Sequence, residues 1–138
     1  MIAYIDSSVL LRILLSSPGR LPEWASIERY VTSEITRLEC LRTLDRRRLE
    51  LSTSADAVAE ARADLDRLLD GFELVELTRA VIARASDPMP QPVKTLDAIH
   101  LSTALLWRDQ GEPETVIATH DRKMASIARE FGFATIGV

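Results

Sequence analysis

The sequence predicts an α/β fold in which a mainly parallel sheet is covered by helices on both faces. Short apolar runs typical of strands alternate along the chain with longer segments whose apolar residues recur at helical spacing. Strands that alternate with helices pair in parallel, because each helix returns the chain to the same end of the sheet. The length of 138 residues, with 46% hydrophobic residues, suits one globular domain over residues 1–138.

The first strand and helix begin the chain. The apolar run at residues 2–5 predicts a strand, and residues 9–15 form a predicted buried helix capped by a serine. Prolines and a glycine then predict a loop over residues 16–22. A short helical or irregular piece follows around Trp24, whose side chain we expect to pack in the core.

The second strand and helix contain an acidic exception to an apolar pattern. We predict a short strand at residues 30–31 and a helix over residues 33–48. The helix is predicted from apolar residues that recur at spacings near three to four: Ile35, Leu38, Leu41, Leu44 and Leu49. Glu39 borders this stripe, so its carboxylate can point into the fold.

The middle of the chain continues the alternation. A second amphipathic helix is predicted over residues 54–69, where Gly71 stops it, and a strand over residues 72–77. A short helix over residues 78–85 leads into an irregular loop at residues 87–92, which three prolines stiffen.

The C-terminal part begins with the most apolar helix of the chain. Thr95 is its predicted N-cap, and so many of its sides are apolar that we expect it to be well buried. The remaining predicted elements are a strand, a turn, a helix ended by Gly132 and a last strand, at residues 115–118, 119–121, 122–131 and 134–138.

Charge and cysteine content exclude several classes of protein. A net charge of −4 gives no global attraction to nucleic acid, although Arg42 and the arginines at 46–48 make one helix end locally basic. The lone Cys40 excludes an internal disulfide and a multi-cysteine zinc site. The first residues lack a basic region and reach a charge at Asp6, which excludes a signal peptide and a membrane span. We therefore expect a cytoplasmic protein.

Four acidic residues far apart in the sequence are predicted to meet. Asp6 and Asp121 each follow a strand and precede a helix, Asp97 lies in the first turn of the apolar helix, and Glu39 borders an apolar stripe. Taken singly, each is an ordinary cap or helix residue. Strand-to-helix junctions of a parallel sheet converge on one edge, where clustered carboxylates repel one another unless a cation binds. The set therefore predicts a site for a hard divalent cation such as Mg²⁺.

Such a site suits hydrolysis of a phosphodiester, because a metal-bound water is available as hydroxide near neutral pH. No Ser-His-Asp motif, glycine-rich phosphate loop or zinc-ligand spacing competes with this interpretation. Arg42 follows Glu39 by about one turn and is a candidate phosphate contact, whereas Ser8 can cap a helix or orient Asp6. His100 lies one turn after Asp97, and we expect it chiefly to pack in the core with a satisfied ring nitrogen.

Four segments together resemble PIN-domain ribonucleases of the VapC toxin type. They are Tyr4-Ile5-Asp6-Ser7-Ser8, Ser33-Glu34-Ile35-Thr36-Arg37-Leu38-Glu39 followed by Arg42, Leu96-Asp97-Ala98-Ile99-His100-Leu101, and Thr119-His120-Asp121. The resemblance implies a three-layer α/β/α sandwich, cleavage of RNA with Mg²⁺ or Mn²⁺, a cognate VapB-type antitoxin and a homodimer.

The resemblance also implies roles for individual residues. Asp6, Glu39, Asp97 and Asp121 would form the acidic cluster that holds the metal and carries catalysis, with Asp6 and Asp97 as its firmest ligands. Thr119 would be a polar helper beside the last acid, and we assign Arg42, Thr119 and Ser8 to substrate binding. His120 stands where the family more often has a small residue.

Modules of other classes also carry an acidic pocket on a parallel sheet. A phosphoryl-accepting receiver module would have adjacent acids after its first strand and a lysine at a late strand end. Serines follow Asp6, and no lysine closes a late strand. A phosphatase of the haloacid dehalogenase type would have a second aspartate where Ser8 stands. A receiver-like or non-catalytic acidic-pocket module remains the alternative function.

Overall fold

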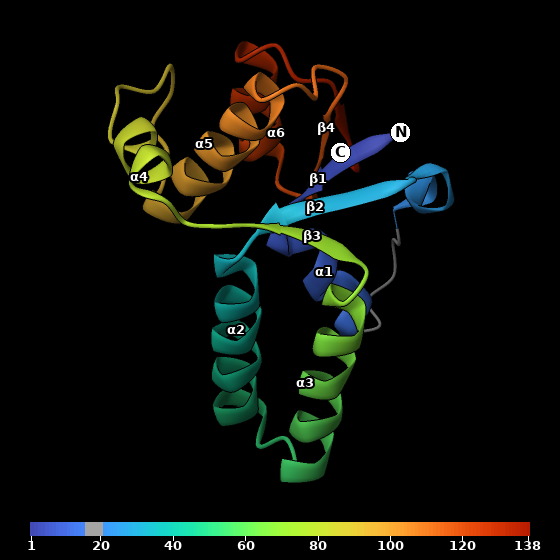
Figure 1. The fold of residues 1–138 in the computed structure, drawn as a ribbon. Helices are drawn as coiled ribbons and strands as arrows, with labels where there is room; N and C mark the ends of the chain where they lie inside the picture. The colour runs from blue at the N-terminus through green and yellow to red at the C-terminus, as the bar shows by residue number, and fades with distance from the viewer. Residues whose placement is uncertain (16–20) are drawn as a thin grey trace.

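The computed structural model describes residues 1–15 and 21–138, which form a five-stranded sheet with helices on both faces (Figure 1). Residues 16–20, most of the predicted loop at 16–22, lie outside the described residues. The elements in chain order are β1 (Ile2–Ile5), α1 (Ser7–Leu14), a 3₁₀ helix (Pro22–Ser26), β2 (Arg29–Ser33), α2 (Ile35–Leu51), α3 (Ala55–Leu69), β3 (Phe72–Val75), α4 (Arg79–Ala85), α5 (Thr95–Asp109), β4 (Val116–Ala118), α6 (Arg122–Glu130) and β5 (Thr135–Ile136).

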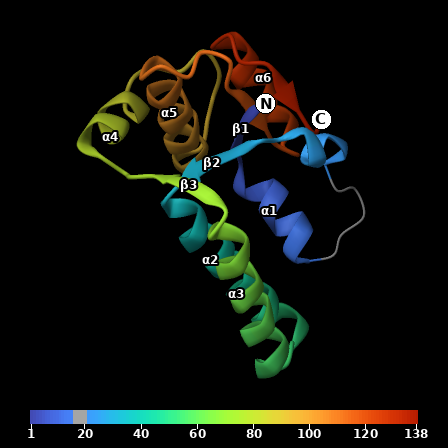
Figure 2. The same cartoon turned by 45° about the vertical axis from the view of Figure 1, so that its right-hand side comes forward.

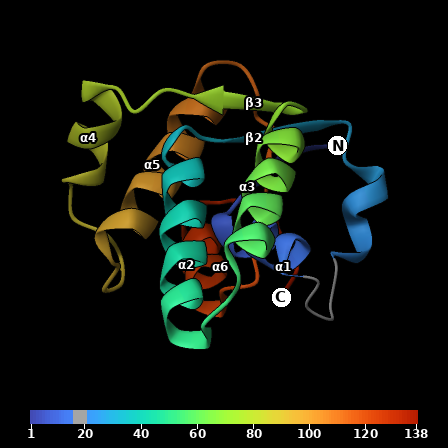
Figure 3. The same cartoon turned by 90° about the horizontal axis from the view of Figure 1, so that it is seen from below.

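The strands are ordered β3-β2-β1-β4-β5, and every neighbouring pair is parallel. The sequence prediction of a mainly parallel sheet is therefore confirmed. Helices α1, α2 and α3 lie on one side of the sheet, and α4, α5 and α6 lie on the other (Figures 1 and 3). The result is the predicted three-layer α/β/α sandwich, in which α2 and α3 project beyond the sheet as a helical hairpin (Figure 2).

Alternation along β1 supplies both core layers. Ala3 and Ile5 belong to the cluster under α1, α2 and α3, whereas Tyr4 belongs to the cluster under α5 and α6. Successive side chains of a strand point to opposite faces, so one apolar strand contributes to both layers of a sandwich. Tyr4 therefore points toward α5, while the end of β1 delivers Asp6 to the carboxyl edge of the sheet.

Most predicted helix starts are wrong by one or two residues: α2 begins at Ile35 rather than residue 33, and α3 and α4 each begin one residue later than predicted. α1 begins at Ser7 rather than residue 9, with Asp6 at its N-cap position and no side-chain cap, so no serine caps it. Thr95 is the first residue of α5 rather than its cap, because Lys94 takes that position. The hydroxyl of Ser8, which favours capping, instead donates to Asp6. At α1, a hydrogen bond to Asp6 thus takes the place of the expected serine cap.

The face of α2 differs from the predicted stripe. Leu38 and Leu49 are 60% and 65% exposed, whereas Thr36 and Cys40 are fully buried. The hydroxyl of Thr36 lies 2.7 Å from that of Thr32 in β2, which turns this side of the helix toward the sheet edge. Thr36 and Cys40 therefore face inward together with Ile35 and Leu44, whereas Leu38 and Leu49 of the predicted stripe face outward.

The shorter predicted strands shift because sheet partners set their ends. β2 extends to Arg29–Ser33 since Thr32 and Ser33 pair with β3, and β3 ends at Val75, where that register ends. β5 shortens to Thr135–Ile136, which are the residues that pair with β4. The rings of Trp24 and Tyr30 lie 4.7 Å apart, which confirms Trp24 as a packing residue. Among the described helices, none combines the length and the apolarity needed to cross a bilayer.

Candidate active site

Asp6 lies at the centre of the carboxyl edge of the sheet. Its side chain is only 6% exposed, and its Oδ2 accepts hydrogen bonds from Ser8 Oγ at 2.6 Å and from Thr119 Oγ1 at 2.8 Å. Its backbone N–H donates to Ala118 O at 3.0 Å, which joins the ends of β1 and β4. Asp6 is thus a buried carboxylate held in one orientation by two hydroxyl donors.

Glu39 reaches the same edge from the first turns of α2. Its Oε1 accepts a long hydrogen bond from Ser7 Oγ at 3.4 Å, and its Oε2 pairs with His100 Nε2. The prediction that this glutamate turns inward is confirmed by these contacts. Ser7 follows Asp6 directly in the chain, so its contact brings the Glu39 carboxylate to the same β1–α1 junction that carries Asp6.

Asp97 lies half-buried in the first turn of α5. Burial raises the pKa of its carboxyl group, and the nearby negative charges of Asp6, Asp121 and Glu39 raise it further, while His100 acts in the opposite direction. Like charges destabilise an ionised carboxylate when they lie close together. The raised pKa is therefore a sign that four predicted acids share one electrostatic environment.

Asp121 occupies the outer rim of this region. It is the N-cap of α6, and its Oδ1 accepts from the backbone N–H groups of Lys123 at 2.7 Å and Met124 at 3.0 Å. Its own N–H donates to Thr119 Oγ1 at 3.0 Å, and the same hydroxyl donates to Asp6. Asp121 thus acts as an ordinary cap and is also linked to the acidic edge through Thr119.

The four acids gather at one edge, but they do not form a closed cage. Within residues 1–15 and 21–138, no three acidic, histidine or cysteine side chains are close enough to hold one ion alone. Mg²⁺ commonly binds through one or two carboxylates and keeps waters or substrate oxygens as further ligands. An open set of carboxylates therefore fits such a cation, and the mutual repulsion at Asp97 is what a cation would relieve.

Arg42 and Glu39 line a common groove of about 790 Å³, opposite Leu96 and Ile99 of α5. The Arg42 side chain is 69% exposed, and its guanidinium lies 3.3 Å from the Asp45 carboxylate rather than pairing with an acid of the cluster. Arg42 therefore lies near Glu39 as predicted, and its guanidinium also makes a weak, exposed ion pair with Asp45 on the same helix.

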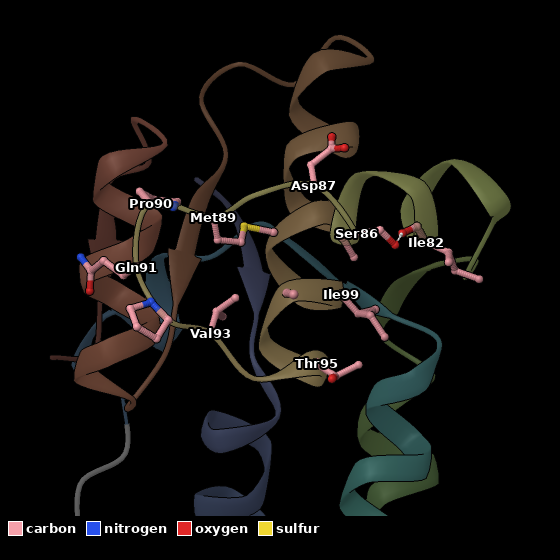
Figure 4. A pocket seen from close by; sticks show the side chains of 12 residues that line it. Ile82, Ser86, Asp87, Met89, Pro90, Gln91, Val93, Thr95 and Ile99 are labelled. Atoms are coloured by element: carbon pink, nitrogen blue, oxygen red, sulfur yellow. Dashed lines mark hydrogen bonds between the residues drawn. The ribbon is translucent and has the colours of Figure 1, made fainter.

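A second hollow, of about 700 Å³, lies between α4, the proline loop and α5 (Figure 4). Gln91 fastens this loop to α6 through Ser126 Oγ at 3.0 Å and through Glu130. The residues that line the hollow include Thr95 and Ile99 of α5 but none of the four acids. Ile99 also lines the groove of Glu39 and Arg42, so the two hollows adjoin along α5.

Tyr4 contacts the acidic edge, although the sequence prediction gave it no role. Its fully buried hydroxyl lies 2.8 Å from Nδ1 of His100, the residue that also contacts Glu39. Burial alone would lower the pKa of His100, but its hydrogen bond to Glu39 and the charges of Asp6, Glu39 and Asp97 together raise it. One signal could have revealed Tyr4, namely its position two residues before Asp6 on the same face of the strand.

Comparison with known proteins places this geometry in a family. The family model described as PIN domain matches residues 3–130. Ribonuclease VapC47 from Mycobacterium tuberculosis strain CDC 1551 / Oshkosh is 32% identical over 139 residues, covering 96% of this chain and 93% of that protein. Ribonuclease VapC46 from M. tuberculosis strain ATCC 25618 / H37Rv is 30% identical over 141 residues, covering 96% and 95%.

A solved structure agrees at the level of the fold. A toxin-antitoxin complex from Klebsiella pneumoniae superposes with a TM-score of 0.66 at 17% identity, covering 90% of each chain. The sequence matches extend over nearly the whole chain, and they include the segments that carry the four acids. The chain therefore belongs to the PIN-domain family and, within it, to the VapC ribonucleases.

Proposed function

We propose that this protein is a divalent-metal-dependent endoribonuclease and the toxin of a toxin-antitoxin pair. The observation that carries the proposal is the meeting of carboxylates from four separate elements at one sheet edge, in a chain of the PIN family. Family membership also argues against the receiver-like or non-catalytic alternative. The relatives named Ribonuclease VapC47 and VapC46 support RNA as the substrate.

In this proposal Asp6, Glu39, Asp97 and Asp121 hold the metal, which is Mg²⁺ or Mn²⁺. All four offer carboxylate oxygens, the donors that both ions prefer. When bound, the ion lowers the pKa of a water and neutralises charge on the phosphodiester. Asp6 is held ready by its hydroxyl partners, so little reorganisation is needed when a cation enters.

The hydroxyl groups of Ser8 and Thr119 act on this site through Asp6. Both donate to Asp6 Oδ2, and the two hydroxyl oxygens lie 3.4 Å apart. In the proposed reaction these hydroxyls keep the Asp6 carboxylate in place beside the bound RNA. Ser8 and Thr119 thus contribute to substrate binding through the position of Asp6.

Arg42 is the proposed phosphate contact. It shares a groove with Glu39 and is largely exposed, so an RNA backbone can reach the guanidinium and the acids together. Its pairing with Asp45 is exposed and therefore weak, which leaves the guanidinium available.

The proposed partner is a VapB-type antitoxin protein. Support comes from the VapC names of the relatives and from the fold shared with the toxin-antitoxin complex from K. pneumoniae. A homodimer remains part of the proposal as a prediction. The proposal includes a cytoplasmic location, where cellular RNA is available as a substrate.

The test is cleavage of structured RNA by the purified protein with Mn²⁺ or Mg²⁺ and with a chelator in excess. We expect endonucleolytic products only with metal, and a loss of at least about 100-fold for Asp6→Asn and for Asp97→Asn. Both changes remove charge and keep side-chain volume, so circular dichroism should show an unchanged fold.

Cleavage that persists in the chelator would contradict the proposed metal dependence. Full activity in both asparagine variants would remove the acidic edge from the chemistry. A matched control is Asp70→Asn, which changes an acid at the C-terminal end of α3, away from the cluster. This variant should keep wild-type activity.

A further inference from the structure

His100 joins three elements of the fold through a single imidazole ring. It lies on α5 with no exposed surface, and its Nδ1 is 2.8 Å from the hydroxyl of Tyr4 on β1. Its Nε2 pairs with Oε2 of Glu39 on α2. The Tyr4 and His100 rings also meet edge to face, with centroids 6.0 Å apart and planes at 71°. Side-chain contacts thus run from Tyr4 on β1 through His100 on α5 to Glu39 at the acidic edge.

The chemistry of the three side chains determines which atoms can donate in each of these hydrogen bonds. An ionised carboxylate can only accept hydrogen bonds, so Nε2 of His100 must carry the proton that it shares with Glu39. A hydroxyl can either donate or accept, so Tyr4 satisfies Nδ1 whether or not that nitrogen is protonated. The contact with Tyr4 is therefore compatible with a ring that donates to Glu39, and it holds that ring in place.

Glu39 depends on His100 more than on any other described partner. The side chain of Glu39 is 17% exposed, and its other hydrogen bond, from Ser7 to Oε1, is long at 3.4 Å. Among the ion pairs of the described residues, Glu39 pairs with His100 and with no lysine or arginine. The contact with Nε2 therefore fixes the rotation of this carboxylate.

A role in packing alone does not account for these contacts. Burying an imidazole and a phenol hydroxyl costs free energy unless both are hydrogen-bonded, and an aliphatic residue would fill the same space without that cost. Here the hydroxyl of Tyr4 contacts Nδ1 of His100, and Nε2 of the same ring contacts Glu39, an acid of the site. By contrast Ser102, equally buried on α5, has a hydroxyl without any partner.

We propose that His100, supported by Tyr4, is a positioning residue that orients the Glu39 carboxylate toward the divalent metal. The inference rests on the proposed function, since it assigns a task around the same acidic site. Residues that hold a metal ligand from behind reduce the entropy lost when the ion binds. Their removal commonly weakens metal affinity about 10- to 100-fold.

The test compares two amides at position 100. The side-chain amide of His100→Asn ends level with Nδ1, so it can still meet Tyr4 but cannot reach Glu39. The amide of His100→Gln ends level with Nε2 and can donate to Glu39. We expect the Kd for Mn²⁺, measured without RNA by calorimetry or electron paramagnetic resonance, to rise about 10- to 100-fold in His100→Asn. His100→Gln should recover most of the affinity.

Two further variants separate positioning from folding. Tyr4→Phe removes only the hydroxyl and should weaken Mn²⁺ binding a few-fold, less than His100→Asn. Ser102→Ala is the matched control for a buried polar group on the same helix and should bind Mn²⁺ as the wild type does. The melting temperature of each variant is measured in chelator, so that lost affinity is judged on folded protein.

The outcomes distinguish this inference from the proposed function. Equal Mn²⁺ affinity in His100→Asn, His100→Gln and the wild type would overturn the positioning role while the ribonuclease proposal stands. Equal weakening in both amide variants would overturn it as well, because the site would then respond to any disturbance of the ring. A wild-type protein that neither binds Mn²⁺ nor cleaves RNA would overturn both.

Discussion

Charged side chains gather at both ends of the sheet, but among the described residues only the cluster at the amino ends of the strands includes an arginine paired with its acids. There Arg29 at the start of β2 lies 2.7 Å from Glu73 and 2.6 Å from Glu112, and its guanidinium also lies over the ring of Trp107 at 5.6 Å. Hydrogen bonding to Arg29 lowers the pKa of Glu73, so the negative charge is favoured. Arg29, Glu73 and Glu112 form what we call the amino-end network.

The carboxyl end follows the opposite arrangement. Asp6, Glu39, Asp97 and Asp121 make no ion pair with lysine or arginine within the part of the chain that the structure describes. Their mutual repulsion raises the pKa of Asp97, which burial has already raised. The comparison teaches that acids balanced within the chain serve the fold, whereas acids left unbalanced are suited to a cation and a substrate from outside.

The largest effect that would sharpen this comparison is expected for Arg42, which lies near the acids but pairs with Asp45. Arg42→Ala should weaken RNA binding about three- to tenfold and lower the slope of log Kd against log salt by about 0.7–0.9, the value for one lost phosphate contact. The melting temperature should not change, because the pair is exposed. Fluorescence anisotropy at several salt concentrations measures the slope.

The control is Arg47→Ala, an exposed arginine of the same helix that does not line the groove. It should leave both the affinity and the slope near their wild-type values. An identical loss in the two variants would mean that Arg42 contributes only general positive charge.

A smaller effect is expected at the other end of the sheet. Arg29→Met keeps the aliphatic stem but removes the cation shared by Glu73 and Glu112, which leaves two like charges close together. We expect thermal unfolding to shift down by about 2–4 °C, with RNA cleavage unchanged. The control Arg37→Met removes a cation that serves only Asp66, and it should cost less. A loss of cleavage in folded Arg29→Met would break the division between the two ends.

The order and type of the elements could be predicted from the sequence because apolar periodicity reflects burial directly. The β1 run and the strongly apolar α5 helix are examples, and both sit where their patterns indicate. Exact starts were less predictable, since Asp6 and Thr95 are residue types that cap helices but use other positions or partners here. At Asp6, the hydrogen bonds from Ser8 and Thr119 take the place of a local cap.

The acidic edge could be anticipated from topology, because a parallel sheet brings its strand ends together whatever the intervening sequence. The link from Tyr4 through His100 to Glu39 could not, since it depends on the rotations of β1, α5 and α2 about their own axes. The outward position of Leu38 has the same cause: periodicity located the stripe, but contacts at the sheet edge chose the buried face. Sequence spacing therefore predicts which residues share a region better than which of them touch.

The smallest effect is expected from removing one repelling charge in the metal-free protein. The folded pKa of Asp97 is raised, so the folded state holds its proton more tightly than the unfolded chain does. Stability therefore falls as pH rises through the unfolded pKa, about 3.9, toward the folded value, and the penalty persists above it. In chelator at pH 7, Asp97→Asn should melt about 1–2 °C above the wild type.

The pH dependence checks the cause of that difference. Melting temperatures of the two proteins should converge as the pH is lowered below about 4, where Asp97 is protonated in both states of the wild type. Saturating Mn²⁺ at pH 7 should reverse the order, because the ion offsets the repulsion and binds the wild type more tightly. A variant that stays less stable at every pH, with and without metal, would mean that Asp97 stabilises the fold like the acids of the amino-end network.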